Sequence, residues 1–159
     1  MYKYILLTAT MALFSCSNSE KAIPDFNFET VEGASISSND LKGKATILVV
    51  WATWCGDCIR EIPELNELAK KYENNENVDF VAFSDEDVQT INNSLEKYPF
   101  NFKQVPNSKS FSDQIKSGLV KHFPQVMVLN KALVPVFEVT ENKEPIFDVL
   151  DKHIQDIIR

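Results

Sequence analysis

Hydrophobic and polar positions follow two rhythms along this chain, one typical of strands and the other of helices. Residues 45–51 and 78–83 are largely unbroken apolar runs, which are typical of strands buried on both faces of a sheet. From Ile59 to Tyr72 the apolar residues recur at helical spacing, and Pro63 is expected to kink that helix. The centre of the fold is therefore predicted to be a strand, a helix and a second strand.

Shorter patterns flank this unit. Strands are predicted at 26–28, 35–36, 100–105, 126–129 and 134–139, helices at 86–98, 111–120 and 144–158, and a helical turn at 38–41. Strand–helix alternation followed by a late antiparallel hairpin implies an α/β fold, with a mixed central sheet and helices on both faces.

The first fifteen residues have the features of a signal peptide. Lys3 gives a basic start, and the apolar run at 5–14 is too short to span a bilayer. The sequence Leu13-Phe14-Ser15-Cys16 resembles a bacterial lipobox. That resemblance implies cleavage before Cys16 and lipid attached to this residue; the alternative is an ordinary secretory signal in which Cys16 is incidental. Residues 1–15 are thus expected to be a signal peptide, 16–23 a lipidated tether and 24–159 one domain.

Composition narrows the function classes. The 159 residues carry a formal net charge of −7, which argues against sequence-independent nucleic-acid binding because such proteins need a basic face. Anionic membranes would repel this chain, so lipid rather than charge would hold it at a bilayer. Ser17 is not the aspartate that retains enterobacterial lipoproteins at the inner membrane, and the outer membrane is favoured on that ground.

Two of the three cysteines are spaced as Cys55-Gly56-Asp57-Cys58, at a predicted strand-to-helix junction. They could be half of a zinc site, but only Cys16, His122 and His153 remain as further ligands among cysteines and histidines. They could also be inert core thiols. A redox pair is favoured, because a helix N-terminus stabilises a thiolate and a second thiol one turn on can resolve a mixed disulfide.

Residues 49–58, Val-Val-Trp-Ala-Thr-Trp-Cys-Gly-Asp-Cys, are similar to the active-site strand and turn of the thioredoxin superfamily. Pro63 resembles that family's helix kink, and Phe123-Pro124 resembles its cis-proline loop. The segments Asp25-Phe26, Leu-Lys-Gly-Lys at 41–44 and Glu-Ile-Pro at 61–63 resemble the membrane-tethered TlpA-like branch, many of whose members reduce disulfides in the bacterial envelope.

The resemblance implies a thioredoxin-like fold with an extra N-terminal β-hairpin and a central αβ insertion. It further implies an envelope thiol–disulfide oxidoreductase facing the periplasm, with Cys55 and Cys58 as its redox disulfide. Trp54, Phe123 and Pro124 would contact substrate. The expected partners are protein disulfides and an envelope redox protein; no cofactor, metal or nucleic acid is expected.

Two carboxylates stand near the thiols. Glu61 follows Cys58 by three residues, so both lie on one helix face, and the family places a glutamate there; we interpret Glu61 as the proton acceptor for Cys58. Asp57 replaces the proline usual in these motifs. Both negative charges disfavour a thiolate and offset the helix dipole, so the protein is predicted to work as a reductant.

Two other functions stay open. A copper chaperone would bind metal through Cys55, Cys58 and His122, although the copper-carrying relatives have a longer cysteine spacer. A thiol peroxidase would use Thr53 and Cys55, although the preceding proline of that pattern is missing. His153 needs no functional role, and the acidic run 85–87 is interpreted as the first turn of a helix.

Overall fold

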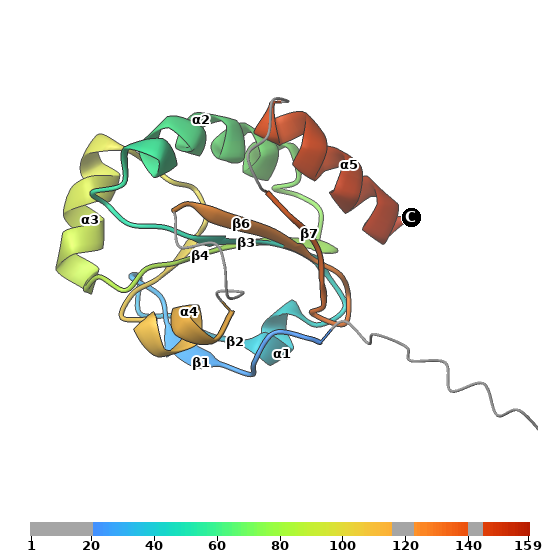
Figure 1. Cartoon of the computed structure of the whole chain (residues 1–159), viewed down its shortest axis with the longest axis horizontal. Helices are drawn as coiled ribbons and strands as arrows, with labels where there is room; N and C mark the ends of the chain where they lie inside the picture. Colours follow the sequence, from blue (N-terminus) through green and yellow to red (C-terminus); the bar gives the residue numbers. More distant parts are fainter. Residues whose placement is uncertain (1–20, 116–122, 140–144) are drawn as a thin grey trace, which may run out of the picture.

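A five-stranded mixed sheet lies at the centre of the protein (Figure 1). The structure is a computed structural model that describes residues 21–115, 123–139 and 145–159. The strand order is β5-β4-β3-β6-β7. The strands are β3 (Ala45–Val50), β4 (Val78–Phe83), β5 (Lys103–Val105), β6 (Gln125–Leu129) and β7 (Pro135–Glu138). β4 runs parallel to β3 and β5, whereas β6 is antiparallel to β3 and β7, which confirms the predicted mixed sheet.

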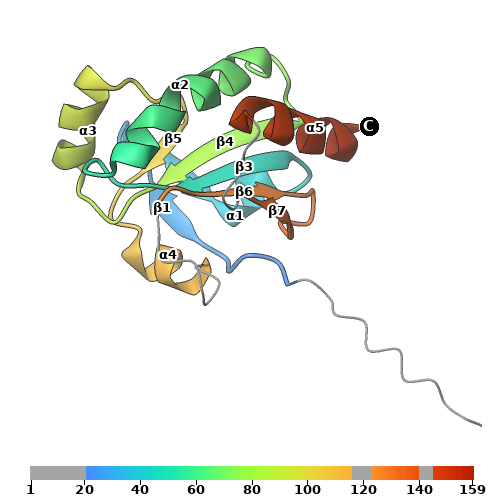
Figure 2. The same cartoon turned by 45° about the horizontal axis from the view of Figure 1, so that its top comes forward.

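Helices cover both faces of this sheet, as predicted. The helices α2 (Gly56–Lys71), α3 (Val88–Lys97) and α5 (Ile146–Ile158) lie on one side. The opposite side carries α1 (Ser38–Leu41), α4 (Lys109–Ile115) and a two-stranded hairpin of β1 (Asn27–Glu29) and β2 (Ser35–Ser37). Figure 2 shows α4 and α2 on opposite sides of the sheet.

The central strand β3 explains the unbroken apolar run in the sequence. All six of its residues are buried. Because successive side chains of a strand point to opposite faces, Ile47 and Val49 pack under α2 and α5, while Leu48 and Val50 pack under the hairpin and α4. A strand with a hydrophobic layer on each face is apolar at nearly every position, and Thr46 is the one polar residue of β3. This pattern agrees with the place of β3 between β4 and β6.

The N-terminal hairpin turns at Gly33, whose φ of +79° is readily available to glycine. Phe26, directly before β1, ties it to the sheet and to α4, since its ring lies 5.2 Å from that of Phe83 in β4 and 5.0 Å from that of Phe111 in α4, between centroids. The hairpin therefore buries the face of the sheet that α4 alone could not cover.

Several boundaries differ from the prediction for identifiable reasons. α3 begins at Val88 rather than at residue 86, because the Asp87 side chain accepts the Thr90 N–H at 2.8 Å and caps the helix. β5 begins only at Lys103; Phe100 and Phe102 before it are buried ring partners, with centroids 4.5 Å apart, rather than strand residues. α2 begins at Gly56 and continues through Pro63.

Some predictions fall on residues that the structure does not describe. These are the signal peptide at 1–15, the lipid site Cys16 with most of the tether, and the part of the helix at 111–120 beyond Ile115. Within the described part of the chain, no helix combines the length and the apolar character needed to cross a membrane.

Candidate functional site

The two cysteines lie where β3 leaves the sheet and α2 begins. Cys55 is the N-cap residue of α2, and its Sγ accepts the Cys58 N–H at 3.1 Å. The structure joins Cys55 and Cys58 in a disulfide, with Cα atoms 5.3 Å apart. An amide at the first turn of a helix has no partner within the helix, so the sulfur takes the place of the capping oxygen found at other helices.

Cys55 is the more accessible of the two thiols. Its relative exposure is 7%, against 2% for Cys58, which lies under the first turn of α2. The positive end of the helix dipole and the N–H that Cys58 donates to the Cys55 sulfur favour a thiolate at the N-cap position. The geometry therefore suits Cys55 for attack on an outside sulfur and Cys58 for attack on Cys55.

An aromatic pair borders the disulfide. Trp54 is the most exposed large hydrophobic side chain among the described residues, at 72%. The ring of Phe123 meets it edge-on, with centroids 5.7 Å apart and planes at 76°. The register of the sheet brings them together, since Gln125 at the start of β6 pairs with Val50 at the end of β3. The Phe123–Pro124 peptide bond is cis, as the resemblance to the cis-proline loop of the thioredoxin superfamily implied.

Glu61 lies one turn beyond Cys58 on α2 and is half-buried. Its Oε2 atom is buried and has no hydrogen-bond partner among the residues that the structure describes. Burial raises the pKa of the Glu61 carboxyl above its usual value, the charges of Asp57 and Glu64 raise it further, and Arg60 opposes them. A carboxylate with a raised pKa is a stronger base than an ordinary one, which suits the predicted role as proton acceptor.

Asp57 has a partner that the sequence interpretation did not include. The Arg60 guanidinium forms an exposed ion pair with the Asp57 carboxylate. Residues three apart on a helix are neighbours, so the spacing in the sequence could have indicated this pair. Its consequence is that Arg60 weakens the negative field that Asp57 exerts on the thiols.

Sequence reasoning also missed Glu86. Its carboxylate accepts the Thr53 N–H and the Thr53 hydroxyl, each at 2.7 Å. The acidic run 85–87 is therefore only partly a helix start, because Asp87 caps α3 while Glu86 points to the cysteine turn. The contact spans 33 residues of sequence, so no local spacing could have revealed it.

Metal ligands do not gather around the disulfide in the part of the structure described. Across residues 21–115, 123–139 and 145–159, no group of three or more His, Cys, Asp or Glu side chains could hold an ion. His122, the third ligand of the copper alternative, lies outside the described residues. His153 stacks on the Phe137 ring at 4.2 Å between centroids, which is a packing role.

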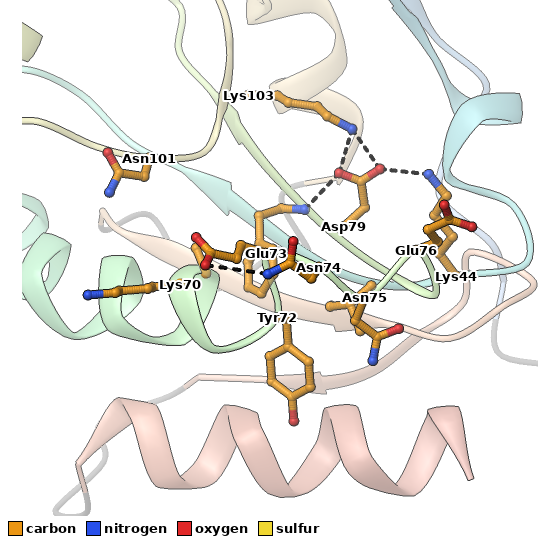
Figure 3. A pocket seen from close by; sticks show the side chains of 13 residues that line it. Lys44, Lys70, Tyr72, Glu73, Asn74, Asn75, Glu76, Asp79, Asn101 and Lys103 are labelled. Atoms are coloured by element: carbon orange, nitrogen blue, oxygen red, sulfur yellow. Dashed lines mark hydrogen bonds and ion pairs between the residues drawn. The ribbon is translucent and has the colours of Figure 1, made fainter.

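A surface hollow lies away from the disulfide. It measures about 1030 Å³ and borders the last turn of α2 and the start of β4. Figure 3 shows Lys44 and Lys103 reaching Asp79 within it, at 3.0 and 2.6 Å. Because β3 and β4 are parallel neighbours, the first residues of β4 and the last residues of β3 lie at opposite ends of the strands. This hollow is thus separate from the cysteine turn.

A family model, described as the AhpC/TSA family, matches residues 20–126, which is more than half of the chain. The chain belongs to the AhpC/TSA family. This AhpC/TSA member is 37% identical over 83 residues to the thiol-disulfide oxidoreductase ResA of Bacillus cereus, covering 52% of this chain and 47% of ResA. It is 48% identical over 52 residues to the thiol:disulfide interchange protein DsbE of Pseudomonas fluorescens, covering 32% of this chain and 29% of DsbE. The chain thus spans about half the length of ResA, and less of DsbE.

Solved structures share the fold of this AhpC/TSA protein. A thiol:disulfide interchange protein of the thioredoxin family from Chlorobium tepidum superposes with a TM-score of 0.73 at 22% identity, covering 90% of this chain and 99% of that one. A thiol-disulfide oxidoreductase from Bacteroides fragilis gives 0.71 at 20% identity, covering 84% and 99%. The predicted thioredoxin-like fold is confirmed, including the N-terminal hairpin and the αβ unit of α3 and β5 in mid-chain.

Proposed function

We propose that this protein is a thiol–disulfide oxidoreductase that exchanges disulfides through Cys55 and Cys58. The observation that carries the proposal is the disulfide itself, placed at the N-terminus of α2 with Cys55 as the cap. An inert structural disulfide would not need the end of a helix, whereas an exchanging one gains thiolate stabilisation from it. The names of the similar proteins ResA and DsbE support the same chemistry.

The exchange takes two steps in the reducing direction. The Cys55 thiolate attacks one sulfur of a substrate disulfide, forms a mixed disulfide and expels the other substrate sulfur as a thiolate. Cys58 then loses its proton to Glu61 and attacks the Cys55 sulfur, which releases the second substrate thiolate. Two electrons pass to the substrate, and Cys55 and Cys58 end as the disulfide.

Charge near the thiols favours the reducing direction. Asp57 and Glu61 lie within a turn of Cys58, and negative charge disfavours the thiolate that a strong oxidant must stabilise. The test is the reduction potential of Cys55–Cys58, measured by equilibration with glutathione. We expect a potential below about −200 mV, and a value near the −120 mV or so of a dedicated oxidant would overturn the reducing role.

Trp54, Phe123 and Pro124 are proposed to form the substrate-binding surface. Trp54 is exposed, Phe123 contacts it, and Pro124 lies just before β6, next to the cysteine turn. The proposed substrates are protein disulfides, and an envelope redox protein would return the Cys55–Cys58 disulfide to its dithiol form. An extended segment of substrate could pass beside this loop with its disulfide over Cys55.

The proposed location is the bacterial cell envelope, with a lipid on Cys16 holding the protein in the outer membrane and the domain facing the periplasm. The sequence Leu13-Phe14-Ser15-Cys16 supports this anchor. Mass spectrometry of the mature N-terminus should show acyl chains on Cys16, and a Cys16→Ala variant should lose them. An unmodified mature chain that begins elsewhere would contradict the anchor.

A further inference from the structure

The turn that carries the disulfide is held in place by a side chain from the neighbouring strand. The ladder between β3 and β4 continues one residue beyond β3, where the Trp51 N–H donates to the Phe83 carbonyl at 3.0 Å. Beyond Trp51 a side chain replaces the backbone as hydrogen-bond acceptor. The Glu86 carboxylate accepts both the Thr53 N–H and the Thr53 hydroxyl at 2.7 Å. The next residues are Trp54 and Cys55.

Glu86 is itself firmly placed. Its N–H donates to the Ser84 hydroxyl at 3.3 Å, and that hydroxyl donates back to the Glu86 carboxylate at 3.1 Å. Its carbonyl accepts the Asn107 N–H at 2.9 Å. Ser84 is fully buried, and its N–H donates to the Val105 carbonyl at the end of β5. The carboxylate is therefore anchored to the sheet before it reaches Thr53.

We propose that Glu86 is a positioning residue for disulfide exchange, acting through Thr53 to fix where Trp54 and Cys55 face the substrate. Two short hydrogen bonds to a carboxylate constrain the backbone and the side chain of Thr53 together. The Cys55 N–H then donates to the Ala52 carbonyl at 3.1 Å and closes the turn on the other side of Thr53. Without Glu86 the backbone of Thr53 loses its partner, and Cys55 loses its fixed place at the end of α2.

Four variants separate the contributions of the hydrogen bonds between Glu86 and Thr53. Glu86→Ala removes both hydrogen bonds to Thr53 and also the acceptor of the Ser84 hydroxyl. Glu86→Gln keeps them without the charge, because the amide oxygen can accept the Thr53 N–H while the amide nitrogen donates to the Thr53 hydroxyl. Thr53→Val removes only the hydroxyl bond, and Thr53→Ser retains both bonds. None of these variants changes the thiols or Glu61.

Two readouts distinguish positioning from simple stability: kcat/KM for insulin reduction, and the pH midpoint of Cys55 alkylation by iodoacetamide in the reduced protein. We expect kcat/KM to fall about tenfold in Glu86→Ala, because this variant removes both hydrogen bonds between the carboxylate and Thr53. We expect a fall of about threefold in Thr53→Val, because this variant removes only the hydrogen bond of the hydroxyl. Glu86→Gln and Thr53→Ser should stay within about twofold of the wild type. Thr53→Val, which alters no charge, should move the alkylation midpoint to higher pH as Cys55 leaves the helix end.

The double variant Glu86→Ala/Thr53→Val completes the test. Its kcat/KM should equal that of Glu86→Ala, because both changes act through one contact. Additive losses would overturn the inference, as would a lowered melting temperature with kcat/KM and alkylation unchanged. If Glu86→Gln is as impaired as Glu86→Ala, charge rather than positioning matters, which also overturns it.

This inference rests on the proposed exchange at Cys55, and the two can fail separately. A wild-type protein that cannot reduce insulin refutes the proposed function, while the alkylation midpoints still report whether Glu86 and Thr53 hold Cys55. Should Glu86→Ala not fold, the comparison of Thr53→Val with Thr53→Ser decides the inference alone. Equal alkylation midpoints in those two variants would then overturn it.

Discussion

The ring of Phe123 lies edge-on against the exposed ring of Trp54, 5.7 Å between centroids, although the two residues are 69 positions apart in the sequence. The contact widens the apolar surface next to Cys55 and braces the exposed indole. An edge-on aromatic pair contributes about 0.5–1.5 kcal/mol beyond its buried area.

A Phe123→Thr variant should therefore bind protein disulfides less well. We expect kcat/KM for a disulfide peptide with an apolar residue beside its cysteine to fall about three- to tenfold, in line with the energy of such a pair. The reduction potential should stay unchanged because no charge is altered. Val136→Thr, which removes an exposed apolar side chain on β7, is the matched control. Equal losses in both variants would rule out a specific role for Phe123.

Cys58→Ser should accumulate mixed disulfides with substrate through Cys55. Cys55 is the more exposed thiol and caps α2, while Cys58 is needed to resolve the intermediate. Non-reducing gels followed by mass spectrometry of the crosslinked peptide would identify the trapped sulfur. Cys55→Ser is the control and should trap little; if it traps substrate through Cys58 instead, the two roles are reversed.

Glu61 should make stability depend on pH. Burial and the Asp57 and Glu64 charges raise the Glu61 pKa above 4.5, so the folded protein holds this proton more tightly than the unfolded chain does. The protonated carboxyl therefore stabilises the fold at low pH, and this stabilisation is lost as pH rises from 4.5 through the raised pKa.

Urea unfolding of the oxidised protein between about pH 4 and pH 8 measures this effect. Glu61→Gln should remove that decline in the free energy of unfolding, whereas Glu67→Gln, at an exposed position of the same helix, should keep it. The Glu61 variant should also resolve mixed disulfides about a hundredfold more slowly, the usual scale of general base catalysis. If the free energy of unfolding of Glu61→Gln depends on pH in the same way as that of the wild type does, the raised pKa of Glu61 is contradicted.

The ion pair of Asp57 and Arg60 predicts opposite effects from its two members. Asp57→Asn removes a charge that disfavours the Cys55 thiolate, so the potential should become more oxidising, by about 10 mV for an exposed charge at a helix end. Arg60→Gln should shift it by a similar amount in the reducing direction. The double variant should return near the wild-type potential, and Lys70→Gln at the far end of α2 should have no effect. Shifts of the same sign in both single variants would show that the charges act by another route.

Local pattern was enough to predict most of the fold. β3 and β4 were recognisable because each is an apolar run with a single polar residue, Thr46 or Asp79, and α2 because its apolar residues recur at helical spacing. The exact ends of the helices and strands were less predictable. α3 starts where the Asp87 cap allows it, and β5 is short because Phe100 and Phe102 pack against each other. Both outcomes depend on contacts that periodicity does not encode.

The sequence by itself determined the chemistry of the site, because Cys55, Cys58 and Glu61 lie within two turns of one helix and their spacing fixes their relative places. Only the tertiary structure decided what surrounds them. Phe123 reaches Trp54 because β6 pairs antiparallel with β3, and Glu86 reaches Thr53 because β4 lies beside β3. These contacts join residues 33 or more positions apart, and strand pairing, rather than spacing along the chain, is the physical reason that they meet.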